Sequence, residues 1–445
     1  MSPRTTTLLR QLGIGSATAL VVSNMIGSGI LTTSGFLAGQ LGSAKLVLSI
    51  WAVGAVCALA GAFCYSELGV NFPSSGGEYV YLTEAFGPTW GFMTGWASFF
   101  AGFSAPIAAA SLAFSDYLGH FSPALKLGAT RIGAPQILAS AIIALFTLNN
   151  CLGIRRTARV QNVLTSLKIL IFLAFLVLGF TAGQGSWHNF ALPAVRTAST
   201  PLFAQFFVSL FYIYVGYSGW NAATYVAEEL KHPSRTLPLS LAYGTALVAA
   251  LYIALNVLFI YAVPLESMKG VVAVGALAAQ HLFGPAVAGI FSAAMALSLL
   301  ATVNAEVTIG PRVYYAMAKN GAFFPAAAKV DPRWHTPVIA IVAQGICTMV
   351  MTLSPFANLL TYIGLLLNVF AVMSVASLFI FRRRPGWQKL GVVNFAYPLL
   401  PVFFIAMGIW ITFRAIQLRP IVSGVAALTI AAGALVYHFR IKKIQ

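Results

Sequence analysis

Charged side chains are scarce in this chain of 445 residues, since Asp, Glu, Lys and Arg together make up only 8% of it. An ordinary soluble domain carries about 25% charged residues. Hydrophobic residues make up 59% of the chain, and the mean hydropathy is +0.86. This composition excludes an ordinary soluble protein and indicates a polytopic membrane protein whose loops are too short to hold a soluble domain of useful size.

Acidic side chains are the scarcest charged group. The chain has 9 Asp and Glu against 26 Lys and Arg, which gives a net charge of +17. In a soluble protein this excess would suggest binding to nucleic acid. Here the basic residues fall in short loops between apolar segments, which indicates membrane topology and contact with anionic lipid headgroups. We therefore expect membrane lipids, and no nucleic acid, as partners.

Cysteine and histidine are also few, which bears on metal sites and on catalysis. The cysteines form no CxxC pair and lie in or at the ends of apolar segments: Cys57, Cys64, Cys151 and Cys347. We expect no disulfide and no metal site. The histidines all fall in expected loops or near helix ends: His120, His188, His232, His281, His335 and His438. An intramembrane serine protease, which the GxSG pattern at residues 216–219 would allow, needs a base within a span. The sequence therefore favours a protein that is not an enzyme and that holds no cofactor.

Long apolar runs dominate what the chain does contain. Twelve of them approach or exceed the length that crosses a hydrocarbon core of about 30 Å at 1.5 Å per residue. Their approximate ranges are 12–38, 45–70, 89–118, 134–150, 160–182, 201–228, 238–263, 285–316, 336–354, 357–381, 393–415 and 420–440. We predict an all-α membrane protein of about 12 transmembrane helices, and we take the first run as a span rather than a cleaved signal peptide.

The distribution of Lys and Arg predicts the orientation. With the N-terminus placed in the cytoplasm, one of the 26 basic residues, Lys168, lies within a span. The outer side collects seven: Lys45, Lys126, Arg131, Arg196, Lys269, Arg414 and Arg419. The inner side therefore collects the other 18. This asymmetry favours an inner or plasma membrane protein with both termini in the cytoplasm.

The first span contains Gly27-Ser28-Gly29 at mid-depth. Glycine costs about 1 kcal/mol relative to alanine inside a helix. One interpretation is that the helix breaks here, so that backbone N–H groups and the positive end of the second half-helix bind a carboxylate. The other is that the glycines let a neighbouring helix pack closely. This stretch alone does not choose between them.

A second candidate break lies in the sixth span at Gly216-Tyr217-Ser218-Gly219. Unwinding there would release carbonyl groups, which attract a cation such as an ammonium group. One break would then supply N–H groups and the other carbonyl groups. This combination suits a zwitterion and hence an α-amino acid, with tight glycine packing again the alternative.

Two short motifs recur at similar distances and indicate internal repetition. The two glycine-rich stretches are about 190 residues apart, and Gly87-Pro88 recurs as Gly284-Pro285 after 197 residues. Five spans separate the members of each pair, and an odd number inverts the second unit in the membrane. We predict a five-plus-five inverted repeat with units at 12–182 and 201–381, followed by two accessory helices at 393–440.

Three charged residues inside or at the ends of spans are further candidates. Lys168 lies about 13 Å along its helix from Arg159, too deep for a charge without a role. We interpret it as a fixed ammonium beside the broken first span, in place of a sodium ion, with snorkelling to the interface as the alternative. Glu306 has three open roles: pairing with Lys168, a proton site in an inner vestibule, or a bond to Arg312 or solvent. Glu67 is expected to fix a loop.

Several motifs together resemble one known family. They are Asn24-Met25-Ile26-Gly27-Ser28-Gly29-Ile30, Glu67-Leu68-Gly69 followed by Phe72-Pro73-Ser74-Ser75-Gly76-Gly77-Glu78-Tyr79, Gly219-Trp220-Asn221, Glu228-Glu229 with Pro233 and Arg235, and Arg312-Val313-Tyr314-Tyr315-Ala316-Met317-Ala318 with Gly321 and Pro325. Over roughly residues 10–380 the chain resembles the amino acid–polyamine–organocation (APC) transporter family, and within it bacterial amino acid permeases and light-chain-type L-amino acid transporters.

The resemblance implies a fold with broken helices 1 and 6 and main-chain contacts to an α-amino acid. It assigns the substrate amine to the carbonyls of Met25, Val215, Gly216 and Ser218, and the carboxylate to the amides of Gly27, Ser28 and Gly29. Gly219 belongs to the same site, and Lys168 takes the position of a lysine found in sodium-independent members. Relatives usually carry an aromatic gate where this chain has Val215, so Tyr214 or Tyr217, with Trp220, is expected to line the pocket instead.

Taken together, the sequence favours a sodium-independent secondary transporter of L-amino acids that works by alternating access, either with protons or by exchange. Neutral substrates are favoured because no carboxylate adjoins either break in the sequence. No obligate protein partner is expected. The alternatives are a polyamine or amine carrier of the same fold and a sensor that binds amino acids without moving them.

Overall fold

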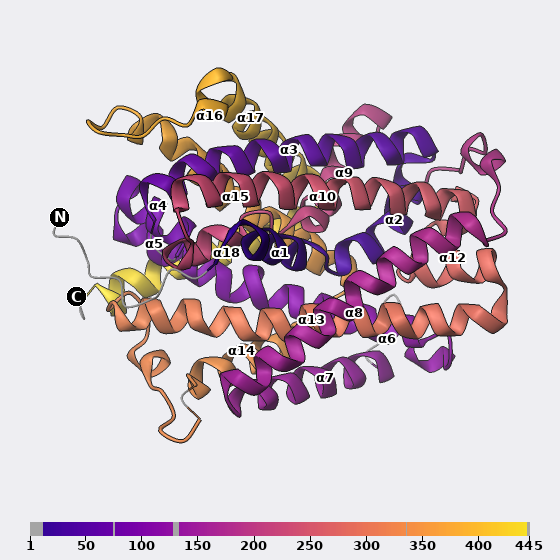
Figure 1. Cartoon of the computed structure of the whole chain (residues 1–445), viewed down its shortest axis with the longest axis horizontal. Helices are drawn as coiled ribbons and strands as arrows, with labels where there is room; N and C mark the ends of the chain where they lie inside the picture. The colour runs from indigo at the N-terminus through magenta and orange to yellow at the C-terminus, as the bar shows by residue number, and fades with distance from the viewer. Residues whose placement is uncertain (1–11, 74–75, 128–132, 335, 443–445) are drawn as a thin grey trace.

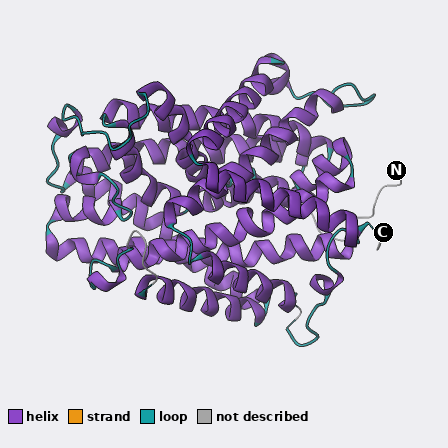
Figure 2. Cartoon of the chain, turned by 180° about the vertical axis from the view of Figure 1, so that it is seen from behind, coloured by secondary structure: helices purple, strands orange, loops and turns teal. Residues whose placement is uncertain are grey.

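The chain folds almost entirely into helices. The computed structural model describes residues 12–73, 76–127, 133–334 and 336–442, and this part of the chain contains no strand beyond an isolated bridge between Leu12 and Leu230. The long helices lie side by side along the long axis of the molecule (Figure 1). Most of the loops gather at its two ends (Figure 2). The predicted all-α membrane class is confirmed.

The helices of the first half are numbered in chain order. They are α1 (Ile14–Met25), α2 (Ser28–Leu41), α3 (Ala44–Asn71), α4 (Glu78–Phe86), α5 (Pro88–Ala97), the π-helical η1 (Ser98–Ser104), α6 (Ala105–Leu118), α7 (Ala134–Cys151) and α8 (Ile154–Thr181). One-turn 3-10 helices, η2 (Pro123–Leu125) and η3 (Trp187–Phe190), lie in the loops.

The second half continues in the same way. It contains α9 (Leu202–Tyr217), the 3-10 helix η4 (Ala222–Glu229), α10 (Pro233–Ala262), α11 (Leu265–Met268), α12 (Val274–Phe283), α13 (Pro285–Lys319), η5 (Pro325–Ala328), α14 (Val338–Met351), α15 (Phe356–Phe381), α16 (Gly391–Phe395), α17 (Leu399–Leu418), α18 (Pro420–Val436) and the π-helical η6 (Tyr437–Ile441).

Eleven of the twelve predicted spans are present. Ten helical runs in the described residues are long and apolar enough to cross a membrane, and the bent pair α1–α2 brings the number to eleven. The remaining segment, 336–354, is helix α14, whose 14 residues reach only about 21 Å. This helix is shorter than the predicted segment, because Pro337 precedes it and a turn before Pro355 ends it. The span predicted from residue 393 also begins later, at Leu399.

Two short helices, α4 and α12, were not predicted. Each ends at a glycine in the positive-φ region, Gly87 at +96° and Gly284 at +77°. Each glycine is followed by a proline, Pro88 or Pro285, that begins the next long helix. Both helices are too short to pass for a span, so a search for long apolar runs does not find them.

The histidines lie where the sequence places them, as far as they are described. They are His120 in a turn, His188 in η3, His232 just before α10, His281 near the end of α12 and His438 in η6, while His335 falls outside the described residues.

Candidate functional site

The first span is broken at the predicted glycines. Helix α1 ends at Met25 and α2 begins at Ser28, with a bend of 44° between the two halves. The linking residues have extended backbone, with ψ of 91° at Ile26 and of −155° at Gly27. Non-helical backbone at membrane depth is tolerated where protein or a cavity surrounds it. Close packing of a neighbouring helix against the glycines therefore does not by itself account for this stretch, because the helix is interrupted here.

Lys168 on α8 lies against this break. Its side chain is 2% exposed, and its Nζ donates to the carbonyl of Ile26 at 2.5 Å and to the Thr302 hydroxyl of α13 at 2.9 Å. The ammonium group therefore points into the protein and does not snorkel. It connects α8 and α13 with the non-helical link between α1 and α2.

The sixth span is broken as well. Helix α9 ends at Tyr217, and Ser218 adopts extended backbone with φ −51° and ψ 141°. Gly219 follows with φ +99°, and the chain then continues as the 3-10 helix η4. A Cβ at Gly219 would come within 2.8 Å of the carbonyl carbon and oxygen of Asn24 on α1. Only glycine combines this backbone with this approach.

The two breaks touch each other. A Cβ placed on Gly29 would lie 2.4 Å from the Cα of Gly216 and 3.0 Å from its nitrogen. On the other side, a Cβ on Gly216 would lie 3.0 Å from the Trp51 ring of α3. In this structure the main chains of the two breaks are thus in direct contact, and a substrate held between them requires the two segments to separate.

Aromatic residues pack beside the first break. The Tyr252 hydroxyl of α10 donates to the carbonyl of Met25 at 2.5 Å. Its ring lies edge-on to Trp51 and close to Tyr217, with ring centroids 5.3 Å apart in both pairs. Tyr217 is 2% exposed and donates to the Trp51 carbonyl at 3.1 Å. Tyr217 therefore belongs to a buried aromatic cluster. Tyr252, which the sequence analysis missed, donates to a carbonyl that was predicted to bind substrate.

A cavity of about 420 Å³ opens beside the breaks, on the side of α1 and η4. It contains five of the predicted residues: Tyr214, Ser218, Gly219, Trp220 and Glu306. Met25, Gly27, Gly29, Val215, Gly216, Tyr217 and Lys168 are not among its lining residues, and the Ser28 side chain lies outside the described part of the chain. The structure thus divides the predicted site into a closed main-chain contact and an adjoining cavity.

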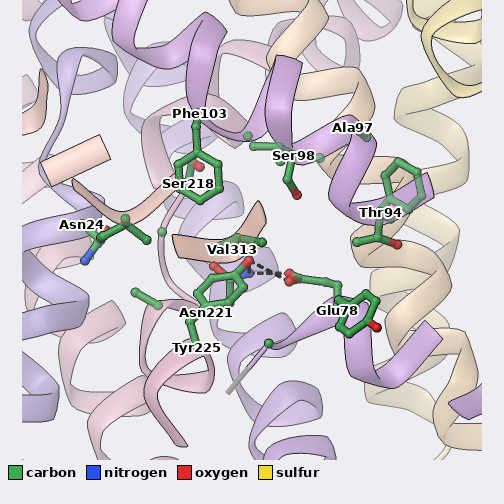
Figure 3. Close-up of a pocket in the computed structure, with 18 of the residues that line it drawn as sticks. Asn24, Glu78, Thr94, Ala97, Ser98, Phe103, Ser218, Asn221, Tyr225 and Val313 are labelled. Carbon is green, nitrogen blue, oxygen red and sulfur yellow. Dashed lines mark hydrogen bonds between the residues drawn. The ribbon is translucent and has the colours of Figure 1, made fainter. Parts of the chain in front are cut away.

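The wall opposite Asn24 comes from the third span. Thr94, Ala97 and Ser98 line it, and Figure 3 shows them across the cavity from Asn24. Ser98 begins the π-helical segment η1, which interrupts the α-helical hydrogen bonding of this span. Such segments occur frequently at functional sites. Pro106, just beyond this segment, lacks the N–H that would bond to the Gly102 carbonyl, and it is the signal that the sequence analysis missed.

A carboxylate also lies in this wall, next to the second break. Glu78, the first residue of α4, accepts from the Asn221 side-chain amide at 2.5 Å and from the Tyr225 hydroxyl at 2.6 Å (Figure 3). All three residues line the cavity. The expectation that no carboxylate adjoins a break is therefore wrong. Glu78 lies beside the second break in the folded protein, although it is 143 residues from Asn221 in the chain.

Glu306 faces the same cavity from α13, one turn beyond Thr302. Among the described residues no ion pair within 4.0 Å connects it with Lys168 or Arg312. Arg312 also lines the cavity and donates to the carbonyl of Thr308 on its own helix. Glu306 therefore lines the cavity wall, and its role there stays a prediction.

The far half of α2 is closed off by side chains of α9. The Gln40 side-chain oxygen accepts from Gln205 at 2.7 Å and from Ser209 at 2.8 Å, and its amide donates to the Tyr212 hydroxyl at 3.2 Å. The Tyr212 ring stacks on Phe36 with centroids 5.5 Å apart.

Loops lie over the same end of α2. The backbone N–H groups of Thr197 and Gly270 donate to the carbonyls of Gly39 and Gly35 at 2.8 and 3.0 Å. Beyond α2, Glu266 accepts from Lys269 and from the backbone N–H of Val195, and these bonds lower its pKa. The molecule is thus packed at one end of the broken span and hollow at the other.

Comparison with known proteins agrees with this architecture. The family model described as amino acid permease matches residues 12–437. The chain is 27% identical to "Large neutral amino acids transporter small subunit 2" of Homo sapiens, covering 97% of this chain and 80% of that protein. It is 27% identical to "Serine/threonine exchanger SteT" of Bacillus subtilis, covering 97% of both. It is 28% identical to "Asc-type amino acid transporter 1" of Mus musculus, covering 97% and 81%. The chain therefore belongs to the amino acid permeases of the APC family, which are membrane transporters and not enzymes.

Proposed function

We propose that this transporter moves neutral L-amino acids across the cytoplasmic membrane by alternating access, without sodium. The observation that carries the proposal is the meeting of two broken spans at Gly29 and Gly216, with the buried ammonium of Lys168 bonded to the same opening. Discontinuous helices that meet near mid-membrane are typical of substrate and ion sites in secondary transporters.

In this proposal the main chain binds the parts that all α-amino acids share. When the breaks separate, the amides of Gly27, Ser28 and Gly29 at the start of α2 take the carboxylate, assisted by the positive end of the helix. Carbonyls at Met25, Val215, Gly216 and Ser218 take the amine. The cavity beyond Ser218 and Gly219 holds the substrate side chain, and Tyr214 and Trp220 lie in its wall.

Lys168 does the work that a bound sodium ion would do. Its ammonium supplies a fixed positive charge to the Ile26 carbonyl, which the break leaves without a helical partner. Glu306 lies one turn beyond Thr302, the second partner of Lys168, and faces the cavity, so it is the proposed route for a proton if protons are coupled.

The names of two relatives support exchange and neutral substrates. One relative is named a serine/threonine exchanger and another a large neutral amino acids transporter. Among the lining residues of the described cavity, Arg312 is the one Lys or Arg, and it shares the cavity with two carboxylates, Glu78 and Glu306, so the cavity does not favour an acidic side chain.

The inverted repeat and the orientation belong to the same proposal. Helices α4 and α12 occupy corresponding positions in the units 12–182 and 201–381, each placed before a Gly-Pro start of a long helix. With both termini in the cytoplasm, as the distribution of Lys and Arg favours, the cavity faces inward. The helices at 393–440 stand outside the repeat.

The test is uptake in proteoliposomes that contain the purified full chain. Labelled L-serine, L-leucine, L-lysine, L-aspartate and spermidine are compared, with sodium or choline outside and with or without unlabelled amino acid inside. We expect uptake of serine or leucine that is accelerated by amino acid inside and is equal in sodium and choline. Uptake that requires sodium, uptake of spermidine alone, or binding without uptake or counterflow would overturn the proposal.

A further inference from the structure

Glu78 is a buried carboxylate that the main-chain site does not use. Its side chain lines the cavity, and the residue is 9% exposed. Its two oxygens accept one bond each from Asn221 and Tyr225, and the Asn221 amide also donates to the Tyr225 hydroxyl at 3.1 Å. Both donors are neutral side chains of the segment that follows the second break.

Among the described residues, no Lys or Arg lies within ion-pair distance of Glu78. The described residues contain three ion pairs within 4.0 Å, and none of them includes Glu78. Glu84 on the same helix, by contrast, lies 3.8 Å from Arg384. Only neutral donors hold the two carboxylate oxygens of Glu78 in the cavity wall. In a region of low dielectric constant, a carboxylate group acts strongly on a charged group that enters the cavity.

We propose that Glu78 determines which substrate side chains this transporter accepts, as a cation-binding group that Asn221 and Tyr225 mask. The inference rests on the proposed function, because it concerns the side chain of an amino acid whose shared groups bind at the breaks. Its negative charge repels an acidic side chain. Its oxygens are already occupied by two neutral donors, so an ammonium group gains little by displacing them.

The geometry separates this role from that of the main-chain site. Asn221 is two residues beyond Gly219, so the masked carboxylate adjoins the break but approaches the cavity from α4. A substrate side chain that extends from the breaks into the cavity reaches the same wall. Removing the two donors leaves the carboxylate unpaired beside that side chain, and a primary ammonium group is then the best available partner.

The experiment measures competition by L-lysine and L-aspartate against the uptake of labelled L-serine and L-leucine in proteoliposomes. The variants are Asn221→Ala with Tyr225→Phe, the same pair with Glu78→Gln, and Glu78→Gln alone. We expect the double variant to lower the half-inhibiting concentration of lysine by about tenfold or more, which corresponds to about 1.4 kcal/mol. Adding Glu78→Gln to this variant should abolish the gain, and Glu78→Gln alone should strengthen inhibition by aspartate.

Glu84→Gln is the matched control, because it makes the same change on the same helix but lies outside the cavity lining. It should leave competition by both amino acids unchanged. Lysine inhibition that is unchanged in the double variant, or a gain that survives Glu78→Gln, would overturn the inference. If a variant loses uptake, thermal stabilisation of the detergent-purified protein by lysine gives the same comparison. Failure of the wild-type protein to take up either labelled amino acid would instead overturn the proposed function.

Discussion

At the scale of single residues, Lys168 carries the strongest prediction. Replacing it with alanine removes the hydrogen bonds that its ammonium group makes to the buried Ile26 carbonyl and Thr302 hydroxyl. We expect Lys168→Ala to lower uptake by about tenfold or more, because a bond to a charged group contributes about 1.5–3 kcal/mol. Uptake in proteoliposomes is the measurement, and gel filtration in detergent checks the fold.

Lys319→Ala is the control for this variant, because Lys319 is exposed at the end of α13 and stacks over Tyr315. It should transport like the wild-type protein. Wild-type uptake by Lys168→Ala would show that the ammonium group has no part in transport.

Thr302 tests whether the position of the Lys168 ammonium group matters as well as its charge. Thr302→Val keeps the shape of the side chain and removes the hydroxyl that binds Nζ, whereas Thr302→Ser keeps the hydroxyl. We expect the valine variant to lose about tenfold in uptake and the serine variant to lose less. Equal uptake by the two variants would assign Thr302 to packing alone.

The sequence identified residues that break a local rule and missed residues whose role comes from distant contacts. A lysine deep in a span and glycines at mid-helix are anomalous wherever they fold, so Lys168 and Gly29 could be predicted. Tyr252 is an ordinary aromatic residue of a span, and Glu78 an ordinary acid in a loop. Their proposed roles depend on hydrogen bonds with Met25 and Asn221, which lie 227 and 143 residues away.

At the scale of helices, the contact between α2 and α9 requires glycine. A methyl group at Gly29 would lie 2.4 Å from the backbone of Gly216, which cannot move aside as a flexible side chain can. We expect Gly29→Ala to force the breaks apart and to abolish uptake, although alanine suits a helix better than glycine does.

Gly15→Ala on α1 is the matched control, because a Cβ there meets nothing within 4 Å. It should keep wild-type uptake and equal or higher thermal stability. Normal uptake by Gly29→Ala would mean that the transporter works without the close contact of the breaks.

The end of α3 illustrates a helix junction whose role the sequence did indicate. Glu67, expected to fix a loop, is fully buried and accepts two bonds of 2.6 Å from Arg382 at the end of α15. It also accepts from the Trp387 ring and the Leu390 backbone.

Removing one partner of such a buried pair costs about 3–5 kcal/mol. We therefore expect Glu67→Ala to lower the melting temperature in detergent much more than Glu84→Ala, whose pair with Arg384 is partly exposed. Similar shifts for the two variants would contradict this reading of the junction.

The lengths of apolar runs predicted most of the helices, but not how each one ends. A run of apolar residues identifies a span because every backbone group in lipid must be paired within the helix. The same reasoning overestimates the length of α14, which a proline before it and a turn after it limit to 14 residues. It also misses α4 and α12, which are too short to cross a membrane. The two breaks were predicted because glycine clusters interrupt otherwise continuous runs.

At the scale of the whole molecule, the two ends of the broken first span differ. Around α2, Gln40 is held by Gln205 and Ser209, and Phe36 stacks on Tyr212. On the side of α1 and η4 the cavity is present instead. A carrier that works by alternating access must close the end that has the cavity when it opens the end around α2. A path open at both ends would let substrate diffuse freely down its gradient. The structure thus corresponds to the conformation that is closed around α2.

This asymmetry predicts which side of the membrane reaches the cavity. In a chain whose four cysteines are replaced by serine, Val313→Cys places one thiol in the cavity wall (Figure 3). We expect a membrane-impermeant maleimide to label it in inside-out vesicles and far more slowly in right-side-out vesicles, and saturating substrate to slow the labelling. Ser199→Cys, in the exposed loop before α9, should show the opposite preference. Reaction of Val313→Cys mainly in right-side-out vesicles would contradict this prediction. Either the orientation inferred from the basic residues is reversed, or the end around α2 opens more often than the end with the cavity. The labelling of Ser199→Cys in the same vesicles decides between these two explanations.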